Sequence, residues 1–459
     1  MFKKIELWVL CLVVLLGIVF TIGFGTLVRQ ELIGKKGKGE ITQAALFLAE
    51  IPIYVKKIYV KKIAAPEKHF HTEDRFPRLS GFVGKPLEQE EYLLLSRYDP
   101  EIEDGVIDLV DLRTFETVYS WNPSLENIRD AIDSHHVEFF VREKKHRIYD
   151  KTSQPGHPFL FEDGSLSFSG TGPLVKISRC SDVSWILQED LFHHSVEQAI
   201  DGSMWVPSKI YPHSFDVALV GSAPDSFSDD AITQISADGK ILFQKSVAQI
   251  LIDHGYKHLV FSIGETFEFV TDPIHLNDIQ PVDFDGPYWL KGDVFLSLRN
   301  QSMLMLYRPK RDEIVWLSTG HTSGQHDIDI LDDHRISVFD NNVYKTVGGH
   351  KVDGTNLLKI YNFETNTFSN YQSEVFEKND IRTGTEGRAQ IRGDGGLYIE
   401  ETNHGRTMYF TAGGEIQWQY VNRGEDGHVY QTHWSRLLYK PADIATVDKL
   451  LSKEPCLEE

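Results

Sequence analysis

One pattern recurs six times after about residue 90: an apolar run, a turn holding Asp or Gly, a second apolar run, and in most cases a closing aromatic residue. Apolar residues within the runs recur with the period of β-strands. Each unit spans roughly thirty to fifty residues, which is enough for four strands. A β-sandwich would explain the strands but not the repeat, so the sequence predicts an all-β fold, a six-bladed β-propeller. The units begin at Tyr92, His157, His194, His275, His326 and Gly387, and four of them end at or near Trp121, Trp185, Trp316 and Trp418.

The N-terminus holds 22 residues without a charge, from Leu7 to Val28. As a helix this stretch would be about 33 Å long, which matches the apolar core of a bilayer. It is long for a signal peptide and no clear cleavage site follows it, which indicates an uncleaved anchor. We therefore expect a single-pass transmembrane signal anchor at residues 1–30, preceding the propeller. The remaining segments are an amphipathic juxtamembrane linker at 31–89, the propeller at 90–440 and a C-terminal tail at 441–459.

The charges around the anchor leave its orientation open. Lysines at positions 3 and 4 precede it, whereas four basic residues follow it between positions 29 and 38, and the positive-inside rule alone would place the large domain in the cytoplasm. Residues 41–63 combine paired lysines with Ile, Tyr and Val around Pro52. That segment suits either a helix in the headgroup layer or one that packs on the propeller.

Composition excludes some classes of function. A net charge of -20 argues against a nucleic-acid partner, because phosphate backbones are bound by an excess of Lys and Arg. No phosphate-binding loop of the GxxxxGK[ST] kind is present, so nucleotide binding has no support. Cys11 lies in the anchor, and Cys180 and Cys456 allow at most one disulfide without requiring one.

Three histidines stand at the beginning of consecutive units: His194, His275 and His326. In a propeller the first strand of each blade lines the central channel, so residues at the strand starts converge on the axis. Any one of them, among 19 histidines, is more simply a polar residue at a strand end. Three in the same structural position favour a shared site instead.

The motifs resemble the bacterial arylsulfate sulfotransferases over roughly residues 90–440. The resemblance is carried by "GQHDIDILDDHRISVFDNN" (324–342), "IHLNDIQPV" with "GDVFLSLRNQS" and "IVWLSTG" (274–320), and "HHSVEQAIDGSMWVP" (193–207). It implies a propeller enzyme that moves a sulfuryl group from an aryl sulfate donor to a phenolic acceptor without a nucleotide, with no cofactor and no metal. It also implies a histidine that is transiently sulfated, His326, two supporting histidines, His275 and His194, and an arginine on the sulfuryl oxygens, Arg299.

These residue types suit the chemistry that the resemblance implies. A neutral imidazole is a competent nucleophile, and a planar guanidinium can hold sulfuryl oxygens through paired hydrogen bonds. A second histidine can protonate the departing phenolate. His193 is a weaker choice than its neighbour for the third histidine, and Asp327 is interpreted as an orienting residue that faces outward.

The chain departs from the family pattern in several places. A membrane anchor stands where better-known members have an N-terminal β-domain, and the closely spaced disulfide of some members has no counterpart. An extra loop, "VDFDGPYW" (282–289), brings aromatic residues that we expect at the acceptor pocket. His433 lies beyond the sixth unit and either joins the site or anchors the C-terminal tail, and we favour the tail. The resemblance implies a propeller on the periplasmic side of the inner membrane, against the charge count, and leaves a homodimer open.

Two other classes of function remain. In a metal-dependent hydrolase or lactonase, His194, His275 and His326 would bind a divalent ion, although such sites usually add inward-facing carboxylates and Arg299 is a poor neighbour for a cation. In a non-catalytic envelope scaffold the propeller would only bind partners. The arginine together with the three histidines favours the enzyme.

Overall fold

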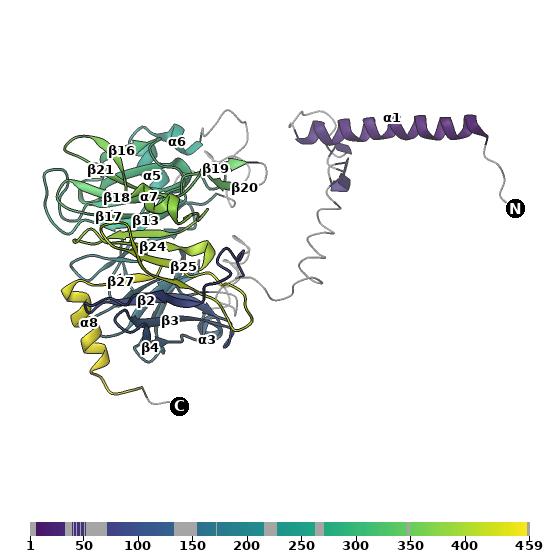
Figure 1. Ribbon diagram of the computed structural model, residues 1–459. Helices are drawn as coiled ribbons and strands as arrows, with labels where there is room; N and C mark the ends of the chain where they lie inside the picture. The colour runs from purple at the N-terminus through teal and green to yellow at the C-terminus, as the bar shows by residue number, and fades with distance from the viewer. Residues whose placement is uncertain are drawn as a thin grey trace. The chain divides into compact units, whose positions relative to one another are not determined.

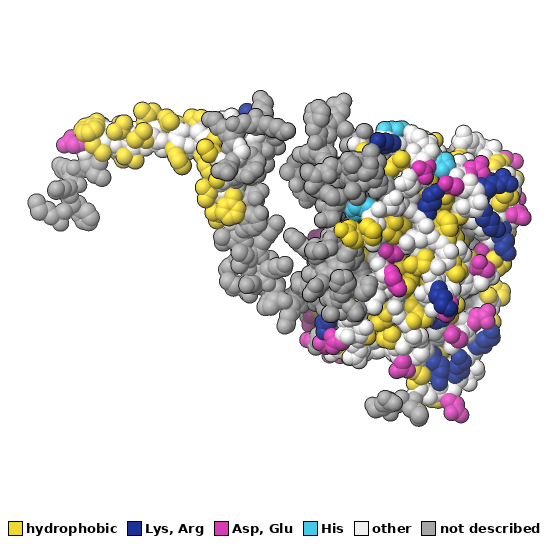
Figure 2. All heavy atoms as spheres, turned by 180° about the vertical axis from the view of Figure 1, so that it is seen from behind, with side chains coloured by type: hydrophobic (Ala, Val, Ile, Leu, Met, Phe, Trp, Pro, Cys, Tyr) yellow, Lys and Arg dark blue, Asp and Glu magenta, His cyan; other side chains and the backbone are white. Residues whose placement is uncertain are grey.

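The computed structural model divides the chain into two compact units, Met1–His69 and Phe70–Glu459. It describes residues 6–32, 39, 41–42, 44–45, 47–49, 51, 71–132, 154–170, 172–214, 227–261, 270–346 and 349–456. The first unit contains helix α1 (Leu7–Leu32). Among the described residues α1 is the one helix long and apolar enough to cross a membrane, with a mean hydropathy of 2.8 over Leu7–Gln30. Its surface in Figure 2 is almost entirely hydrophobic. Most of the segment predicted to be amphipathic, 41–63, falls outside the described residues.

The second unit is mostly β, and its antiparallel sheets are arranged like the blades of a propeller (Figure 1). The first sheet has the order β27 (Arg436–Leu438), β2 (Tyr92–Asp99), β3 (Asp104–Asp111), β4 (Glu116–Trp121). The longest sheet has the order β12 (Ile241–Ser246), β11 (Asp230–Ile235), β10 (Met204–Lys209), β8 (Val183–Phe192), β7 (Gly172–Ile177), β6 (Leu166–Ser169), β5 (Gly156–Leu160), with β9 (Glu197–Gln198) paired to β10.

Three further sheets complete the arrangement. One is β13 (Leu276–Pro281), β14 (Val294–Leu298), β15 (Met303–Arg308), β16 (Glu313–Thr319). The next is β17 (His326–Ile330), β18 (Arg335–Asp340), β21 (Leu357–Asn362), β22 (Thr367–Tyr371), with the hairpin β19 (Val343–Thr346) and β20 (Gly349–Val352) inserted after β18. The last is β23 (Arg388–Ile391), β24 (Leu397–Glu401), β25 (Arg406–Phe410), β26 (Ile416–Val421), β1 (Gly81–Gly84).

Pairings between strands far apart in the sequence join the two ends of the second unit. Strand β27, near the C-terminus, pairs with β2, so that Arg436 lies opposite Leu94. Figure 1 shows β27 in yellow beside β2 in dark blue. Strand β1 pairs with the outer strand β26. These pairings place sheets from opposite ends of the chain beside one another.

Hydrophobic clusters fill the spaces between neighbouring sheets. One joins β2–β4 to β5–β8 around Trp121, and another joins β10–β12 to β13–β16. Two of the tryptophans that end the repeated units, Trp121 and Trp418, are fully buried, whereas Trp185 and Trp316 are partly buried. Apolar residues from facing sheets interdigitate in this way when sheets pack face to face.

Short helices connect or cover the sheets. The longest of them in the second unit, α8, begins with Pro441 at its first turn, where the missing N–H costs nothing, and Asp443 accepts from the backbone N–H of Lys440 at 3.0 Å. Among the described residues of this unit the helices are α3 (Leu125–Ala131), α5 (Val247–Asp253), α6 (Lys257–Phe261), α7 (Ser373–Lys378) and α8 (Pro441–Leu451), with 3₁₀ turns at Arg299–Gln301, Pro309–Arg311 and Thr402–His404.

A disulfide joins Cys180 to Cys456 across 276 positions of sequence and ties the C-terminal segment to the turn between β7 and β8. We expect Cys456→Ser to lower the free energy of unfolding by about 2–4 kcal/mol, because the crosslink restricts the unfolded chain. Urea unfolding of the two proteins measures the difference, with Cys11→Ser as the matched control. Equal midpoints for wild type and Cys456→Ser would contradict the prediction.

Candidate functional site

Histidines gather where the innermost strands begin. Strand β17 begins with His326, and β13 begins directly after His275. Near the start of each inner strand, one described residue that is not glycine has a positive φ, between 48° and 61°. The six residues are His157, His194, His275, Asp327, Glu386 and Trp434. A positive φ is uncommon for such residues, and where it persists the surrounding structure imposes it, most often at functional sites.

The three predicted histidines lie together, as the sequence analysis expected of their positions. The Nε2 atoms of His194 and His275 are 3.2 Å apart. The ring centre of His194 lies 5.9 Å from that of His326 and 5.8 Å from that of His157. His433 adds a further ring, 5.1 Å from His157. Five imidazoles therefore surround one small volume within the described residues.

The hydrogen bonds of His326 fix which of its nitrogens carries the proton. The amide nitrogen of Asn341 donates to the carbonyls of Thr383 and Glu386, at 3.0 and 2.7 Å, so the amide oxygen Oδ1 faces the imidazole. That oxygen lies 2.7 Å from Nδ1 of His326 and can only accept. Nδ1 is therefore the donor. Nε2 keeps its lone pair and receives only the backbone N–H of Glu386, at 3.2 Å. Burial lowers the pKa of His326 to about 3, so the ring is neutral at physiological pH.

His275 has a carboxylate behind it. Its Nδ1 lies 2.8 Å from Oδ2 of Asp272, and its backbone N–H donates to Asp230 at 3.0 Å. Nδ1 must therefore carry a proton that it donates to Asp272, and Nε2 faces His194. His194 is neutral, because burial lowers its pKa well below the usual value. The pair can hold one extra proton or pass it on. The alternative histidine, His193, is buried against Asp230, with its Nε2 3.2 Å from Oδ1, and lies outside this pair.

Arg299 supplies a cation to the same place. Its backbone N–H donates to the carbonyl of His275 at 3.1 Å, which places it beside the histidine pair. Only 8% of the residue is exposed, and its Nη1 donates to Asn300 at 3.0 Å. Its Nε and Nη2 atoms have no hydrogen-bond partner among the described residues. Buried donors are rarely left without an acceptor, so this guanidinium has the character of an anion-binding group.

Glu386 is the acidic member of the cluster. Its Oε2 is buried and lies 3.7 Å from Nε2 of His157, which is too far for a normal hydrogen bond. Burial raises the pKa of this carboxyl, but the surrounding His433, His157 and His326 outweigh it and hold the pKa below its usual value. Glu386 is therefore ionised. Sequence analysis did not identify Glu386 or His157 as site residues, although His157 opens the second unit as the three predicted histidines open theirs.

Acidification is expected to destabilise the second unit. Burial lowers the pKa of His157 and His326 to about 3 and that of His193 to about 4, whereas an unfolded histidine titrates near about 6.5. Between those values the unfolded chain binds more protons than the folded one, so the free energy of unfolding falls as the pH falls below about 6. Burial raises the pKa of Asp278 and Glu91 to about 7 and that of Asp190 to about 6. These carboxyls act the other way, because the stability linked to their protonated forms is lost as the pH rises through those values.

Denaturant unfolding of the wild type from about pH 7 to about pH 5 measures this slope. His193→Gln, which removes one histidine with a lowered pKa and keeps both members of the histidine pair, should make the slope shallower. A slope that His193→Gln leaves unchanged would contradict the assignment.

Three expectations from the sequence are wrong. Asp327 does not face outward: it is buried, forms an ion pair with Arg388 at 3.3 Å and accepts from the N–H of Ala389. His433 is not only a tail residue, because its ring joins the cluster. The loop 282–289 follows the far end of β13, about 20 Å along the strand from His275, and so cannot line the same site.

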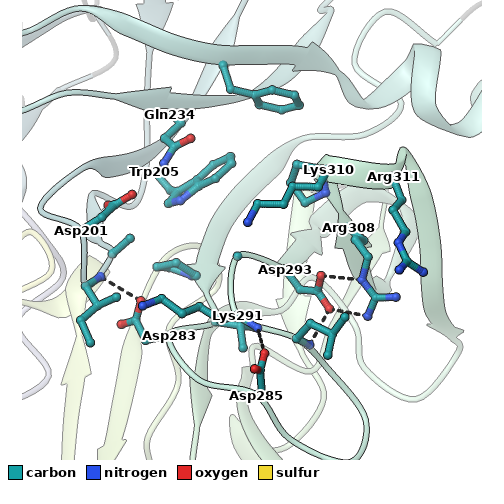
Figure 3. Close-up of a pocket in the computed structure, with 18 residues that line it drawn as sticks. Asp201, Trp205, Gln234, Asp283, Asp285, Lys291, Asp293, Arg308, Lys310 and Arg311 are labelled. Carbon is teal, nitrogen blue, oxygen red and sulfur yellow. Dashed lines mark hydrogen bonds and ion pairs between the residues drawn. The ribbon is translucent and has the colours of Figure 1, made fainter.

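That loop lines a separate pocket of about 750 Å³ together with the turn at 199–201 and residues 308–311. Figure 3 shows Trp205 and Lys310 on facing sides of it. Arg308 is held by Asp293 through bonds of 2.8 Å from Nε and Nη2. The pocket therefore lies at the opposite end of β13 from the histidine cluster and is not part of that site.

Comparison with known proteins identifies a family. The sequence model of the arylsulfotransferase (ASST) family matches residues 156–423, more than half of the chain. No curated protein matches.

Solved structures resemble the chain only distantly. A protein of unknown function from Bacteroides caccae has 13% identity and a TM-score of 0.46, covering 75% of this chain and 98% of its own. The Pan2 WD40 domain of Neurospora crassa has 9% identity and a TM-score of 0.39, covering 81% and 91%. Virginiamycin B lyase from Staphylococcus aureus has 11% identity and a TM-score of 0.32, covering 58% and 70%. Likenesses this distant carry no argument about function.

Proposed function

The chain belongs to the arylsulfotransferase family, and on that premise we propose that it moves a sulfuryl group from an aryl sulfate to a phenol through a sulfohistidine on His326. One observation carries the proposal. The unprotonated Nε2 of a neutral, buried imidazole lies in the same cluster as a guanidinium whose Nε and Nη2 donors have no partner in the described part of the chain. A nucleophile beside an anion-binding cation is the arrangement that transfer of an anionic group requires.

In the first half-reaction the lone pair on Nε2 of His326 attacks the sulfur atom of the donor ester. A sulfur–nitrogen bond forms as the sulfur–oxygen bond to the aryl group breaks, and the electron pair leaves on the phenolate oxygen. Arg299 holds the sulfuryl oxygens, over which negative charge spreads. The pair formed by His194 and His275 enters this step with one extra proton shared between the two Nε2 atoms and gives that proton to the departing phenolate, which leaves both rings neutral.

The second half-reaction reverses these steps with a different phenol. The acceptor loses its proton to the histidine pair, its oxygen attacks sulfur, and the sulfur–nitrogen bond breaks so that His326 regains its lone pair. Asp272 keeps the proton on Nδ1 of His275, which leaves Nε2 to exchange the other one. Atoms and charge balance over the cycle without a nucleotide or a redox partner.

Six blades are part of the proposal. The longest sheet is divided into β5–β8 and β9–β12, because β8 meets β10 at only two residue pairs, whereas β9 pairs with the other end of β10. Six hydrophobic clusters, each between consecutive four-strand sets, support this division. The positive-φ residues, one near each inner-strand start, support it as well.

We also place the propeller outside the cytoplasm, anchored by α1 in the inner membrane. The disulfide between Cys180 and Cys456 supports this side, because disulfides form and persist in oxidising compartments. The basic residues that follow the anchor would then contact lipid headgroups.

The full-length protein in detergent, given an aryl sulfate that releases a coloured phenol, tests the reaction. Without an acceptor we expect one burst of phenol per site and a mass increase of about 80 Da on the peptide that contains His326. With a second phenol we expect turnover, sulfation of that phenol and ping-pong kinetics. Steady release without an acceptor would indicate a hydrolase, and no release by folded protein would overturn the proposal.

Asn341 is proposed as the positioning residue for the nucleophile. Asn341→Ala removes the oxygen that fixes the proton on Nδ1 of His326, and we expect kcat to fall by about 10–100-fold with a small change in KM. Asn341→Asp keeps that acceptor and should recover part of the loss. A merely structural role would instead lower the melting temperature of both variants and leave the burst rate per folded molecule unchanged.

A further inference from the structure

We propose that His157, His194 and Glu386 form a binding site for a divalent transition-metal ion, with zinc as the metal that best fits these ligands. Each residue offers one ligand atom, and the three atoms lie within 4.8 Å of one another. The residues come from the starts of three different inner strands, β5, β9 and β23, so the site depends on the folded propeller. The proposal does not depend on sulfuryl transfer.

The distances are close to those of a zinc centre. Zinc ligands at about 2.0–2.2 Å in a tetrahedron are about 3.4 Å from one another. Nε2 of His157 and Oε2 of Glu386 are 3.7 Å apart, so a shift of a few tenths of an ångström suffices for this pair. His194 offers a ring nitrogen within 4.8 Å of the other two ligand atoms, and its ring centre is 5.8 Å from that of His157.

Unpaired polar atoms point to a ligand at this place. His157 is 1% exposed, and neither of its ring nitrogens has a hydrogen-bond partner among the described residues. Oε2 of Glu386 is equally without a partner in that part of the chain, and so is Nδ1 of the adjacent His433. Leaving several buried polar atoms unpaired is costly, and a metal ion would satisfy two or more of them at once.

Charge favours a cation. Glu386 is ionised, whereas His157 and His194 are neutral because burial lowers their pKa values. A neutral imidazole and an ionised carboxylate are the forms that bind metal. Arg299 is the nearby permanent cation and attracts the carboxylate of Glu386. An anionic substrate bound to the guanidinium would neutralise that charge, and Glu386 would then be left without a counter-charge. Two nitrogen ligands select zinc or a similar transition metal over calcium or magnesium, which prefer oxygen.

The sequence argument against a metal relied on a lack of carboxylates facing the axis, and Glu386 removes that objection. Two other groups of histidine and carboxylate are weaker candidates. His71, His428 and Asp426 lie at the surface, where His71 is 2.9 Å from the hydroxyl of Tyr430 and Asp426 accepts from that hydroxyl and from the N–H of His428. The other group, Asp332, Asp333 and His334, pairs with Arg335.

The test uses full-length protein without a polyhistidine tag, stripped of metal by a chelator and dialysed. We expect equilibrium dialysis to give one more equivalent of zinc in the wild type than in His157→Gln or Glu386→Gln, with affinity at the site reduced by at least about 100-fold in each. Cobalt should give the intense visible absorption of a tetrahedral site, and both variants should lose it. His428→Ala, which alters the surface cluster, is the matched control and should keep the signal.

A measurement on the wild type alone covers the case in which a variant does not fold. Zinc should protect the partly buried His194 from acylation by diethyl pyrocarbonate, as read by peptide mass spectrometry, while the exposed His428 stays reactive. Equal zinc binding by wild type and both variants, or no protection of His194, would overturn the proposal. The sulfuryl-transfer assay, run with chelator present, reports separately on the proposed function, so either proposal can fail alone.

Discussion

His326→Ala is expected to abolish sulfuryl transfer, with kcat/KM falling by about 10⁴-fold or more. In the proposed mechanism the nucleophile is the lone pair on Nε2 of His326, because Nδ1 carries the proton that it donates to Asn341. The burst of phenol and the mass increase should both disappear, because no covalent intermediate can form. Stopped-flow absorbance and mass spectrometry of the quenched protein measure the two effects.

The matched control is His334→Ala, which removes a partly exposed histidine from the turn that follows the same strand, β17. It should leave the burst unchanged. A His326→Ala protein that is folded and keeps activity within about tenfold of the wild type would show that the nucleophile lies elsewhere.

The wild-type reaction should also persist in mild acid. Burial lowers the pKa of His326 to about 3, so we expect the burst of phenol at about pH 5, where an ordinary histidine is mostly protonated.

Arg299→Lys is expected to lower kcat/KM by about 10²–10³-fold although it keeps the charge, because an ammonium group cannot offer the paired donors of a guanidinium. Arg299→Ala should cost at least as much. Arg299 also adds to burial in lowering the pKa of His326, so Arg299→Ala should raise that pKa toward the usual value. Initial rates give the first effect, and titration of the ring resonances by NMR gives the second.

Arg308→Lys is the control for this substitution, since Arg308 lies at the far end of the same sheet and is paired with Asp293. Its effect on transfer should be within about twofold, because the ion pair between Arg308 and Asp293 lies at the other end of the sheet from the histidine cluster. If Arg299→Lys retained full activity and Arg299→Ala left the pKa of His326 unchanged, Arg299 would have no contact with the transferred group.

Strand periodicity and the repeated unit were enough to predict a mostly β, propeller-like fold and to bring His194, His275 and His326 together. The residues that escaped prediction depend on contacts between distant parts of the chain. His433 looked like a tail residue because pairing of β27 with β2 cannot be read from sequence order. Glu386 directly precedes the sixth unit and has no local signal beyond that position. Asn341 did have a local signal in the sequence, because it ends the Phe-Asp-Asn run at the end of β18.

The buried carboxylate at Asp327 shows a second limit. Alternation along a strand predicts which face a side chain takes, and a bulge reverses that prediction. The pairing of β17 with β18 shifts between His326 and Ile328, which is where Asp327 lies. The same kind of shift occurs near the start of β5 and β13. Local irregularity at the strand starts therefore hides from the sequence the residues that form the site.

The left-handed residues at the strand starts also bear on how such a protein evolves. Within the described chain they are three histidines, an aspartate, a glutamate and a tryptophan in nearly the same backbone conformation. The conformation is thus imposed by the fold and tolerates very different side chains. The backbone that presents these side chains is therefore separate from the chemistry they supply, and a substitution at one of these positions can change the groups around the cluster without changing the ring that carries them.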